Sequence, residues 1–197
     1  MTLQHLPRDE TRERILAVAL QLIADHGFAA TSTREISERL GFTKAALYYH
    51  FRTKDDLLAA IVAPAMEDLR ALLDKASPRG GPVARHQFVE GYVDLVASHE
   101  DLVRVLSDDP SARRRMALTA AAPLYDRMAR LLSGSEAPDT AQRARVRAAL
   151  GAVHAALLGA APDDDREVVR AAAQATACAA LGLHSPRPSA SRRPSFA

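Results

Sequence analysis

The chain has 197 residues, 48% of them hydrophobic and 25% charged, and its formal net charge is only +2. This length and composition suit a soluble globular protein with a sizeable core. A net charge so close to zero excludes bulk positive charge as the basis of any binding to nucleic acid.

Cysteine usage and the apolar stretches favour a cytoplasmic location. Cys178 is the only cysteine, which rules out an intramolecular disulfide, and its apolar helical surroundings favour a buried structural side chain. The N-terminal residues include acids and lack an apolar signal region. The longest apolar stretch, 148–161, is too short to cross a bilayer, so we expect no membrane contact.

The N-terminal quarter predicts short helices separated by glycines. Apolar residues at helical spacing predict a first helix over about 9–26, with Asp9 at its cap and Gly27 at its end. A second helix follows Ser32, which stands in capping-box spacing before a glutamate, and ends at Gly41.

Two further caps predict a third and a fourth helix. Thr43 opens a short third helix that runs to about His50, and Thr53 opens a longer fourth helix that connects to the rest of the chain over 55–76. Pro64 lies inside the fourth helix, where it bends the helix or leaves a carbonyl unpaired.

The rest of the chain predicts a larger helical unit. A linker rich in Pro and Gly is expected at 77–82, and the segment 184–197 is expected to be disordered because it is rich in Pro, Ser and Arg. We predict an all-α protein of about nine helices, with an N-terminal domain over 1–54 and a C-terminal bundle over 77–183. Its last five helices are expected near 88–96, 102–106, 116–131, 140–160 and 164–181.

Two short helices joined by a glycine turn form a helix-turn-helix, whose second helix can enter the major groove of DNA. The segment from Lys44 to Lys54 contains three positive residues and no acid, although residues 1–56 as a whole carry eight basic and eight acidic residues. A small core is predicted from the inward-facing apolar residues Ile15, Leu22, Ile36, Leu40, Leu47, Phe51 and Leu57.

The run T-x-x-I-x-x-x-L-G-F-T-K-x-x-L-Y-Y-H-F-x-x-K-x-x-L resembles the N-terminal domain of the tetracycline-repressor (TetR) family of bacterial transcriptional regulators, over about residues 9–58. Ser37 and Leu40 are bulkier than the residues often found there, and Ala45 stands where glycine is frequent. The resemblance implies phosphate contacts from Thr33, Thr43, Tyr48, Tyr49, His50 and Lys54. It implies base-edge contacts from Lys44 and Ala45, with Tyr48 as a further candidate.

Packing is the alternative interpretation of these side chains. A Tyr-Tyr-His-Phe run in an arbitrary helix is more often half-buried packing, and we accept that interpretation for Leu47 and Phe51. For Tyr48 and Lys54 we favour contact with DNA. His50 is left open between contact with DNA and support of the turn into the fourth helix.

The resemblance also implies a C-terminal domain that forms a homodimer and holds a small molecule. The helices expected at 140–160 and 164–181 carry long faces of small residues, which allow close approach between two subunits. An alanine-rich core within one subunit explains the same composition. Candidate ligand residues mix apolar bulk with polar tips, although each is individually typical of ordinary core or surface: Tyr92, His99, Met116, Tyr125 and Met128.

The remaining polar residues favour structural roles. His86, His99 and His154 are too far apart in sequence to predict a metal site, and no cofactor is expected. The aspartates at 163–165 are typical of a helix start. The arginines at 113–115 predict a solvated face, with contact to an anionic ligand as the alternative.

Three functional hypotheses follow. The first is a ligand-responsive repressor that binds a palindromic operator as a homodimer. The second is a helical enzyme, which we reject because the sequence has no phosphate loop, nucleophile elbow or zinc-protease motif. The third, kept as the alternative, is a helical adaptor or regulator that binds protein without a small-molecule ligand.

Overall fold

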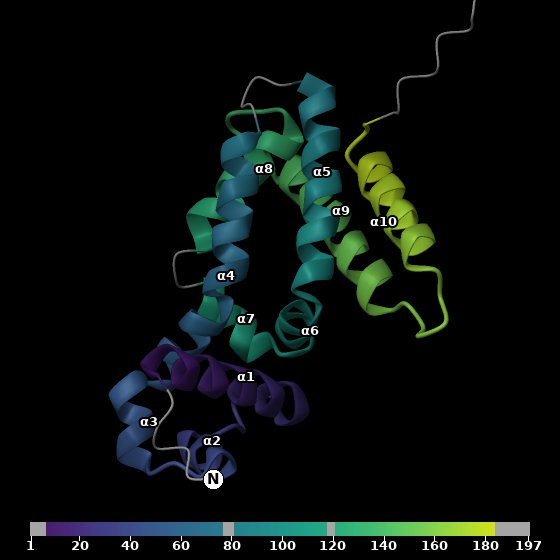
Figure 1. The fold of residues 1–197 in the computed structure, drawn as a ribbon. Coiled ribbons are helices and arrows are strands. Elements are labelled where there is room, and N and C mark those ends of the chain that lie inside the picture. Colours follow the sequence, from purple (N-terminus) through teal and green to yellow (C-terminus); the bar gives the residue numbers. More distant parts are fainter. Residues whose placement is uncertain (1–6, 77–80, 118–120, 184–197) are drawn as a thin grey trace, which may run out of the picture.

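The computed structural model describes residues 7–76, 81–117 and 121–183, apart from the side chains of residues 116 and 117. These ranges contain α-helices and no strand, which confirms the predicted all-α fold class (Figure 1). None of the helices in these ranges is both long and apolar enough to span a membrane. The helices are α1 (Arg8–His26), α2 (Thr33–Leu40), α3 (Lys44–His50), α4 (Lys54–Lys75), α5 (Gly81–Ser98), α6 (Glu100–Asp108), α7 (Pro110–Ala117), α8 (Ala121–Ser133), α9 (Thr140–Leu158) and α10 (Arg166–Ala180).

The caps predicted for α2, α3 and α4 are confirmed. The Ser32 hydroxyl accepts a hydrogen bond from the Glu35 N–H at 3.1 Å, and the Glu35 carboxylate accepts one from the Ser32 N–H. The Thr43 hydroxyl accepts the Ala46 N–H at 3.1 Å. Gly41 ends α2 in the left-handed conformation at φ 69°, which a residue with a side chain rarely adopts. The sequence therefore fixes where the short helices begin and end.

The predicted cap of α1 is wrong. α1 begins at Arg8 with Pro7 at its N-cap position, and no side chain caps it. Asp9 lies inside the first turn, where its negative charge stabilises the helix dipole without bonding the backbone. The ring of Pro7 restricts its φ, which is −49°, and the helix begins directly after it, two residues before the start that a cap at Asp9 would give.

Two boundaries in the C-terminal part also differ from prediction. The linker expected at 77–82 is helical at its end, because α5 begins at Gly81, and residues 77–80 lie outside the described part. The helix expected over 116–131 is two helices, α7 and α8. Pro123 lies in the first turn of α8, where its missing N–H costs little. The disorder expected over 184–197 also falls outside the described residues.

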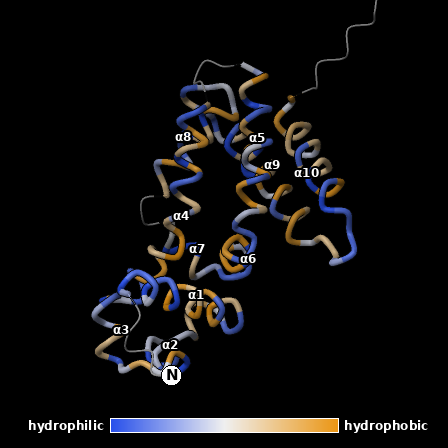
Figure 2. Tube along the Cα trace, in the orientation of Figure 1, coloured by the Kyte–Doolittle hydropathy of each residue, from blue (hydrophilic) through white to orange (hydrophobic). Residues whose placement is uncertain are grey.

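The buried side chains form two clusters that meet along α4. The first joins α1, α2 and α3 to the start of α4 and to α6, and it contains all seven apolar residues predicted for the small core. The second fills the space between the end of α4 and helices α5, α8, α9 and α10. Met66 touches both clusters, so α4 is shared by the two halves. Hydrophobic residues recur beside hydrophilic ones along these helices, as amphipathic packing requires (Figure 2).

The corner between α6 and α7 joins the two halves through one carboxylate. Asp109 Oδ2 accepts the backbone N–H of Phe28, in the loop between α1 and α2. Asp109 Oδ1 accepts the N–H groups of Ser111 and Ala112, at 2.8 and 3.1 Å, and so caps α7. An ion pair between Arg115 of α7 and Asp55 of α4 lies beside it. One end of α7 is thus attached to the N-terminal helices.

These hydrogen bonds change the acidity of Asp109. Burial alone would raise the pKa of its carboxyl, but the hydrogen bonds from Ser111, Phe28 and Ala112 outweigh burial and lower the pKa below its ordinary value. A carboxyl whose pKa is lower in the folded state stabilises the fold above its unfolded pKa. That stability is lost as the pH falls through the folded pKa.

We predict that Asp109→Asn lowers the free energy of unfolding at pH 7 by about 1–3 kcal/mol, because the amide cannot accept on both sides. The difference from wild type shrinks as the pH falls below the ordinary pKa of an aspartate and through the lower folded pKa of Asp109, where the wild-type carboxyl becomes protonated. Urea denaturation followed by circular dichroism between pH 7 and 3 measures it. Asp108→Asn, at the exposed neighbouring position, is the control. Equal pH dependence in the two variants would contradict the assigned role of Asp109.

Candidate nucleic-acid interface

The seven residues of α3 divide into one buried anchor and an exposed face. Leu47 is 1% exposed and holds the helix against α1 and α2. Ala45 and Tyr49 lie on the exposed side, and the Tyr49 side chain is 69% exposed. A ring of this size is normally covered, so its exposure marks a surface that can contact another molecule.

Three of the predicted DNA-contacting side chains lie together between α2 and α3. The hydroxyls of Thr33 and Tyr48 are 3.4 Å apart, and the Lys44 ammonium lies 5.7 Å from the centre of the Tyr48 ring. The two hydroxyls and the ammonium can all donate to a phosphate oxygen. Thr43 is exposed beside them, and its hydroxyl hydrogen remains available because the oxygen acts only as an acceptor in the cap.

Two arginines that the sequence interpretation left out lie beside the same face. The Arg8 guanidinium is 5.3 Å from the centre of the Tyr49 ring, and the Arg12 guanidinium is 5.4 Å from the centre of the Phe51 ring. Burial, and then the charges of Arg8 and Arg12, lower the pKa of His50, so its imidazole is neutral at pH 7. The helical spacing of Arg8 and Arg12 was visible, but their distance from α3 in the sequence concealed the contact.

Lys54 has partners inside the protein. Its ammonium donates to the carbonyls of Phe28 and Thr31, the latter at 2.9 Å, with a longer contact of 3.3 Å to Ala29. It also lies 4.3 Å from the centre of the Phe28 ring. Burial, and then the charge of Arg115, lower the pKa of Lys54. Lys54 therefore holds the loop between α1 and α2, and its contact with phosphate stays a prediction.

The acids near this face are engaged within the protein. Glu38 pairs with Arg34 at 2.7 Å, and Asp56 accepts the N–H of Thr53 at 3.0 Å. Arg52 is exposed, and no described residue forms an ion pair with it. A chain region that is neutral overall thus presents unpaired positive charge on one side, which is the requirement for binding a phosphate backbone.

The second candidate site is a cavity in the C-terminal half. It has two compartments, of about 140 and 540 Å³, that share the lining residues Tyr92, Arg113, Tyr125 and His154. Of the predicted ligand residues, Tyr92, Tyr125 and Met128 line the cavity. His99 instead pairs with Asp68 at 2.8 Å, outside the lining.

His154, whose sequence position excluded it as a metal ligand, lines the cavity in the folded chain. Met116 lies in α7, but its side chain is outside the described part. Within that part, no group of three His, Cys, Asp or Glu side chains is arranged to hold a metal ion.

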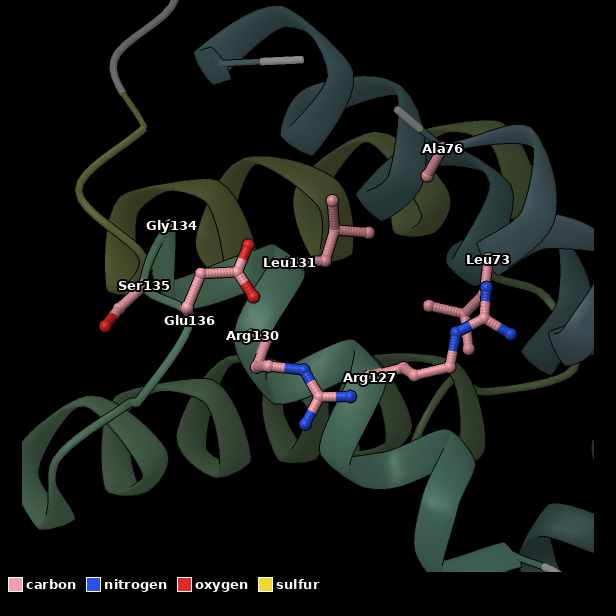
Figure 3. A pocket seen from close by; sticks show the side chains of 8 residues that line it. All are labelled: Leu73, Ala76, Arg127, Arg130, Leu131, Gly134, Ser135 and Glu136. Atoms are coloured by element: carbon pink, nitrogen blue, oxygen red, sulfur yellow. The ribbon is translucent and has the colours of Figure 1, made fainter. Parts of the chain in front are cut away.

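A further hollow lies at the far end of α8 (Figure 3). Leu73 and Ala76 of α4 form one side, and Arg127 and Arg130 of α8 extend along the other. Arg127 is paired with Asp74 at 2.7 Å. Among the described residues, this hollow shares no lining residue with the cavity around Tyr92, and no predicted site residue whose side chain is described lies in it.

Comparison with known proteins gives a match in the N-terminal region. Residues 15–61 match the family described as bacterial regulatory proteins, tetR family. The chain is 46% identical over 52 residues to the HTH-type transcriptional regulator AcrR of Shigella flexneri, which covers 26% of this chain and 24% of that protein. It is 38% identical over 64 residues to the HTH-type transcriptional activator FasR of Mycolicibacterium smegmatis, covering 32% and 29%. The chain thus matches less than a third of the length of each of these relatives.

The whole fold has a counterpart among solved structures. A transcriptional regulator of the TerR/AcrR family from Aquifex aeolicus superposes with a TM-score of 0.61, covering 84% of this chain and 96% of that chain at 18% identity. An identity this low supports the fold alone. The comparisons, rather than the lack of an enzyme motif, support a regulator over an enzyme.

We predict that Lys54→Met destabilises the fold and that Lys44→Met leaves its stability nearly unchanged. Lys54→Met leaves several carbonyls without their donor and lowers the free energy of unfolding by about 1–3 kcal/mol. Lys44→Met removes an exposed charge and changes the free energy by less than about 0.5 kcal/mol. Urea denaturation of the two variants and wild type measures both. Equal stability of the two variants would show that the carbonyl contacts of Lys54 contribute nothing.

Proposed function

We propose that the chain is a transcriptional repressor that binds a palindromic operator as a homodimer and is released by a small molecule, and the match of residues 15–61 to the TetR family of regulators supports this. The observation that carries the proposal is the exposed face of α3, where Thr33, Lys44 and Tyr48 lie together above a buried Leu47. A helix anchored on one side and polar on the other can enter the major groove.

We assign distinct roles to the side chains of this face. Lys44 and Tyr48 reach base edges, and the small side chain of Ala45 allows close approach to them. Thr33, Thr43, Tyr49 and the neutral His50 donate to phosphates. The main role of Lys54 is to hold the α1–α2 loop through its carbonyls, and contact with a phosphate is a secondary role. Arg8, Arg12 and Arg52 add positive charge along the path of the backbone.

Selection from a pool of random duplexes by the purified protein tests this function. We expect enrichment of a two-fold symmetric sequence whose half-sites lie about one helical turn apart or a multiple of it. Tyr48→Ala and Lys44→Ala each abolish binding of the enriched duplex in a gel-shift assay while the circular dichroism spectrum stays unchanged. Affinity that falls steeply with salt indicates phosphate contacts.

Arg70→Ala, on the exposed surface of α4, is the matched control and binds as wild type does. If no duplex is enriched, or both α3 variants bind unchanged, the DNA-binding face is misassigned. The protein-binding adaptor then becomes the better hypothesis.

The homodimer is supported by the outer surfaces of α9 and α10. One helix of seven residues reads few bases, so a single subunit gives weak specificity. Small residues recur at helical spacing on the exposed side of α9, at Ala144, Ala148, Gly151 and Ala155. On α10 the exposed Val168 is followed by further exposed alanines (Figure 1 shows both helices at one side of the molecule). Two such helices from each subunit can form a four-helix interface.

We predict that wild type sediments as a species of twice 21.2 kDa and that Ala148→Arg sediments as a monomer. In a two-fold interface the introduced arginine meets small residues and lies close to its own copy, so crowding and like charge oppose assembly. Ala59→Arg, at an exposed alanine of α4, remains a dimer. Analytical ultracentrifugation of wild type and the two variants measures their masses in solution. If Ala148→Arg is still a dimer, the interface does not include this surface of α9.

Release by a small molecule needs a connection between the cavity and the DNA-binding face. Leu106 of α6 and Arg113 of α7 line the cavity, and Asp109 between them accepts the N–H of Phe28. A ligand that binds better to one position of α7 therefore shifts the population of the attached N-terminal helices. This shift changes the distance between the two recognition helices of the dimer.

A further inference from the structure

The inner compartment of the cavity is apolar. It lies between α4, α5 and α6, and its walls include Met66, Leu69, Leu95, Val96, Leu102 and Leu106. Apart from the four residues shared with the outer compartment, no charged side chain lines it. A hydrocarbon chain or ring is the group that gains most from leaving water for such a space.

The outer compartment carries an excess of positive charge. Arg113, Arg143 and Arg147 line it, and among the described residues Asp126 is the one carboxylate in its lining. Asp126 is paired with Arg143 at 3.2 Å. No described residue accepts a hydrogen bond from the guanidinium of Arg113 or Arg147. Two guanidinium groups thus face the cavity without a counter-charge, and a carboxylate matches their geometry.

The polar pair at the boundary adds no charge. The Tyr92 hydroxyl and His154 Nε2 are 2.9 Å apart. Burial raises the pKa of the Tyr92 hydroxyl and lowers the pKa of the His154 imidazole, so both are neutral at pH 7. The two side chains share a hydrogen bond, and neither carries a negative charge that would attract a cationic ligand. The unpaired ionic groups that line the cavity are therefore arginines.

We propose that this cavity binds amphipathic carboxylates, molecules with an apolar body and one anionic head. The apolar body fills the inner compartment, and the carboxylate lies between Arg113 and Arg147. An inorganic anion would leave the apolar walls in contact with water, and a neutral hydrocarbon would leave the two guanidinium groups unused. The proposal deepens the proposed function in that it names the chemical class of the releasing molecule.

Isothermal titration calorimetry with three matched probes tests the class. Decanoate, 1-decanol and decyltrimethylammonium share one hydrocarbon body and differ in the charge of the head. We expect decanoate to bind at least about tenfold more tightly than decanol, as a charge-assisted contact to arginine implies, and the ammonium probe to bind more weakly than decanol. Equal binding of decanoate and decanol would overturn the proposal.

Three variants locate the carboxylate. Arg113→Gln and Arg147→Gln each reduce the affinity for decanoate about tenfold while the affinity for decanol stays unchanged. Arg130→Gln is the control, because Arg130 is an arginine of the separate hollow in Figure 3. If both cavity variants keep the preference for decanoate, or Arg130→Gln loses it, the assigned site is wrong. Arg147 is exposed on α9, so its substitution tests the proposal even where Arg113→Gln fails to fold.

A separate measurement distinguishes this inference from the proposed function. The same probes are added to the complex of the protein with its selected duplex, and release is followed by gel shift. Binding with the expected preference but without release confirms the ligand class and removes its regulatory role. Release by decanol and decanoate alike, at equal affinity, supports the regulator and overturns the class.

Discussion

The position of the DNA-binding helices depends on how the loop between α1 and α2 is held. Thr31 is buried, with 1% of its surface exposed. Its hydroxyl donates to the carbonyls of Leu22 and Gly27, at 3.1 and 2.9 Å. The Lys54 ammonium donates to carbonyls of the same loop, and the Asp109 carboxylate accepts the backbone N–H of Phe28, which also belongs to this loop. Groups from α4 and from the α6–α7 corner therefore meet on one loop. A buried backbone polar group without a partner is costly, so these contacts favour one orientation of α2 and α3 over others.

Local capping chemistry made the N-terminal helices predictable. Ser32, Thr43, Thr53 and Gly41 act within four residues of their own position, so their roles are visible in the sequence. The inward set around Leu47 was predictable for the same reason, because helical spacing alone decides which residues share a face. The charge balance was less informative. A region with equal numbers of acids and bases still presents positive charge beside α3, since the acids of α2 and of the first turn of α4 (Glu35, Glu38, Asp55 and Asp56) are engaged with neighbouring groups.

The parts that escaped prediction depend on contacts between distant segments. Lys54 matched a DNA-contacting position, but its loop carbonyls lie more than twenty residues away in the chain. Arg8 and Arg12 meet Tyr49 and Phe51 only once α1 has packed on α3. His154 becomes a cavity residue through Tyr92, sixty-two positions earlier. His99 lies outside the cavity lining because it pairs with Asp68 on α4, 31 positions earlier. Local pattern carries none of this information.

The geometry of α7 links the two sites in a way that has a thermodynamic consequence. Arg113 in the cavity and Asp109 at the loop are one helical turn apart, joined by the hydrogen bond from the Arg113 N–H to the Asp109 carbonyl at 3.1 Å. Binding at Arg113 and docking of the loop on Asp109 therefore act on the same short helix. If a ligand weakens DNA binding through α7, bound DNA must weaken ligand binding by the same factor, because the coupling free energy is shared. In the proposed mechanism, a ligand bound near Arg113 acts by making one position of α7 less compatible with the Phe28 contact. Its effect cannot exceed the difference between its own affinities for the two positions.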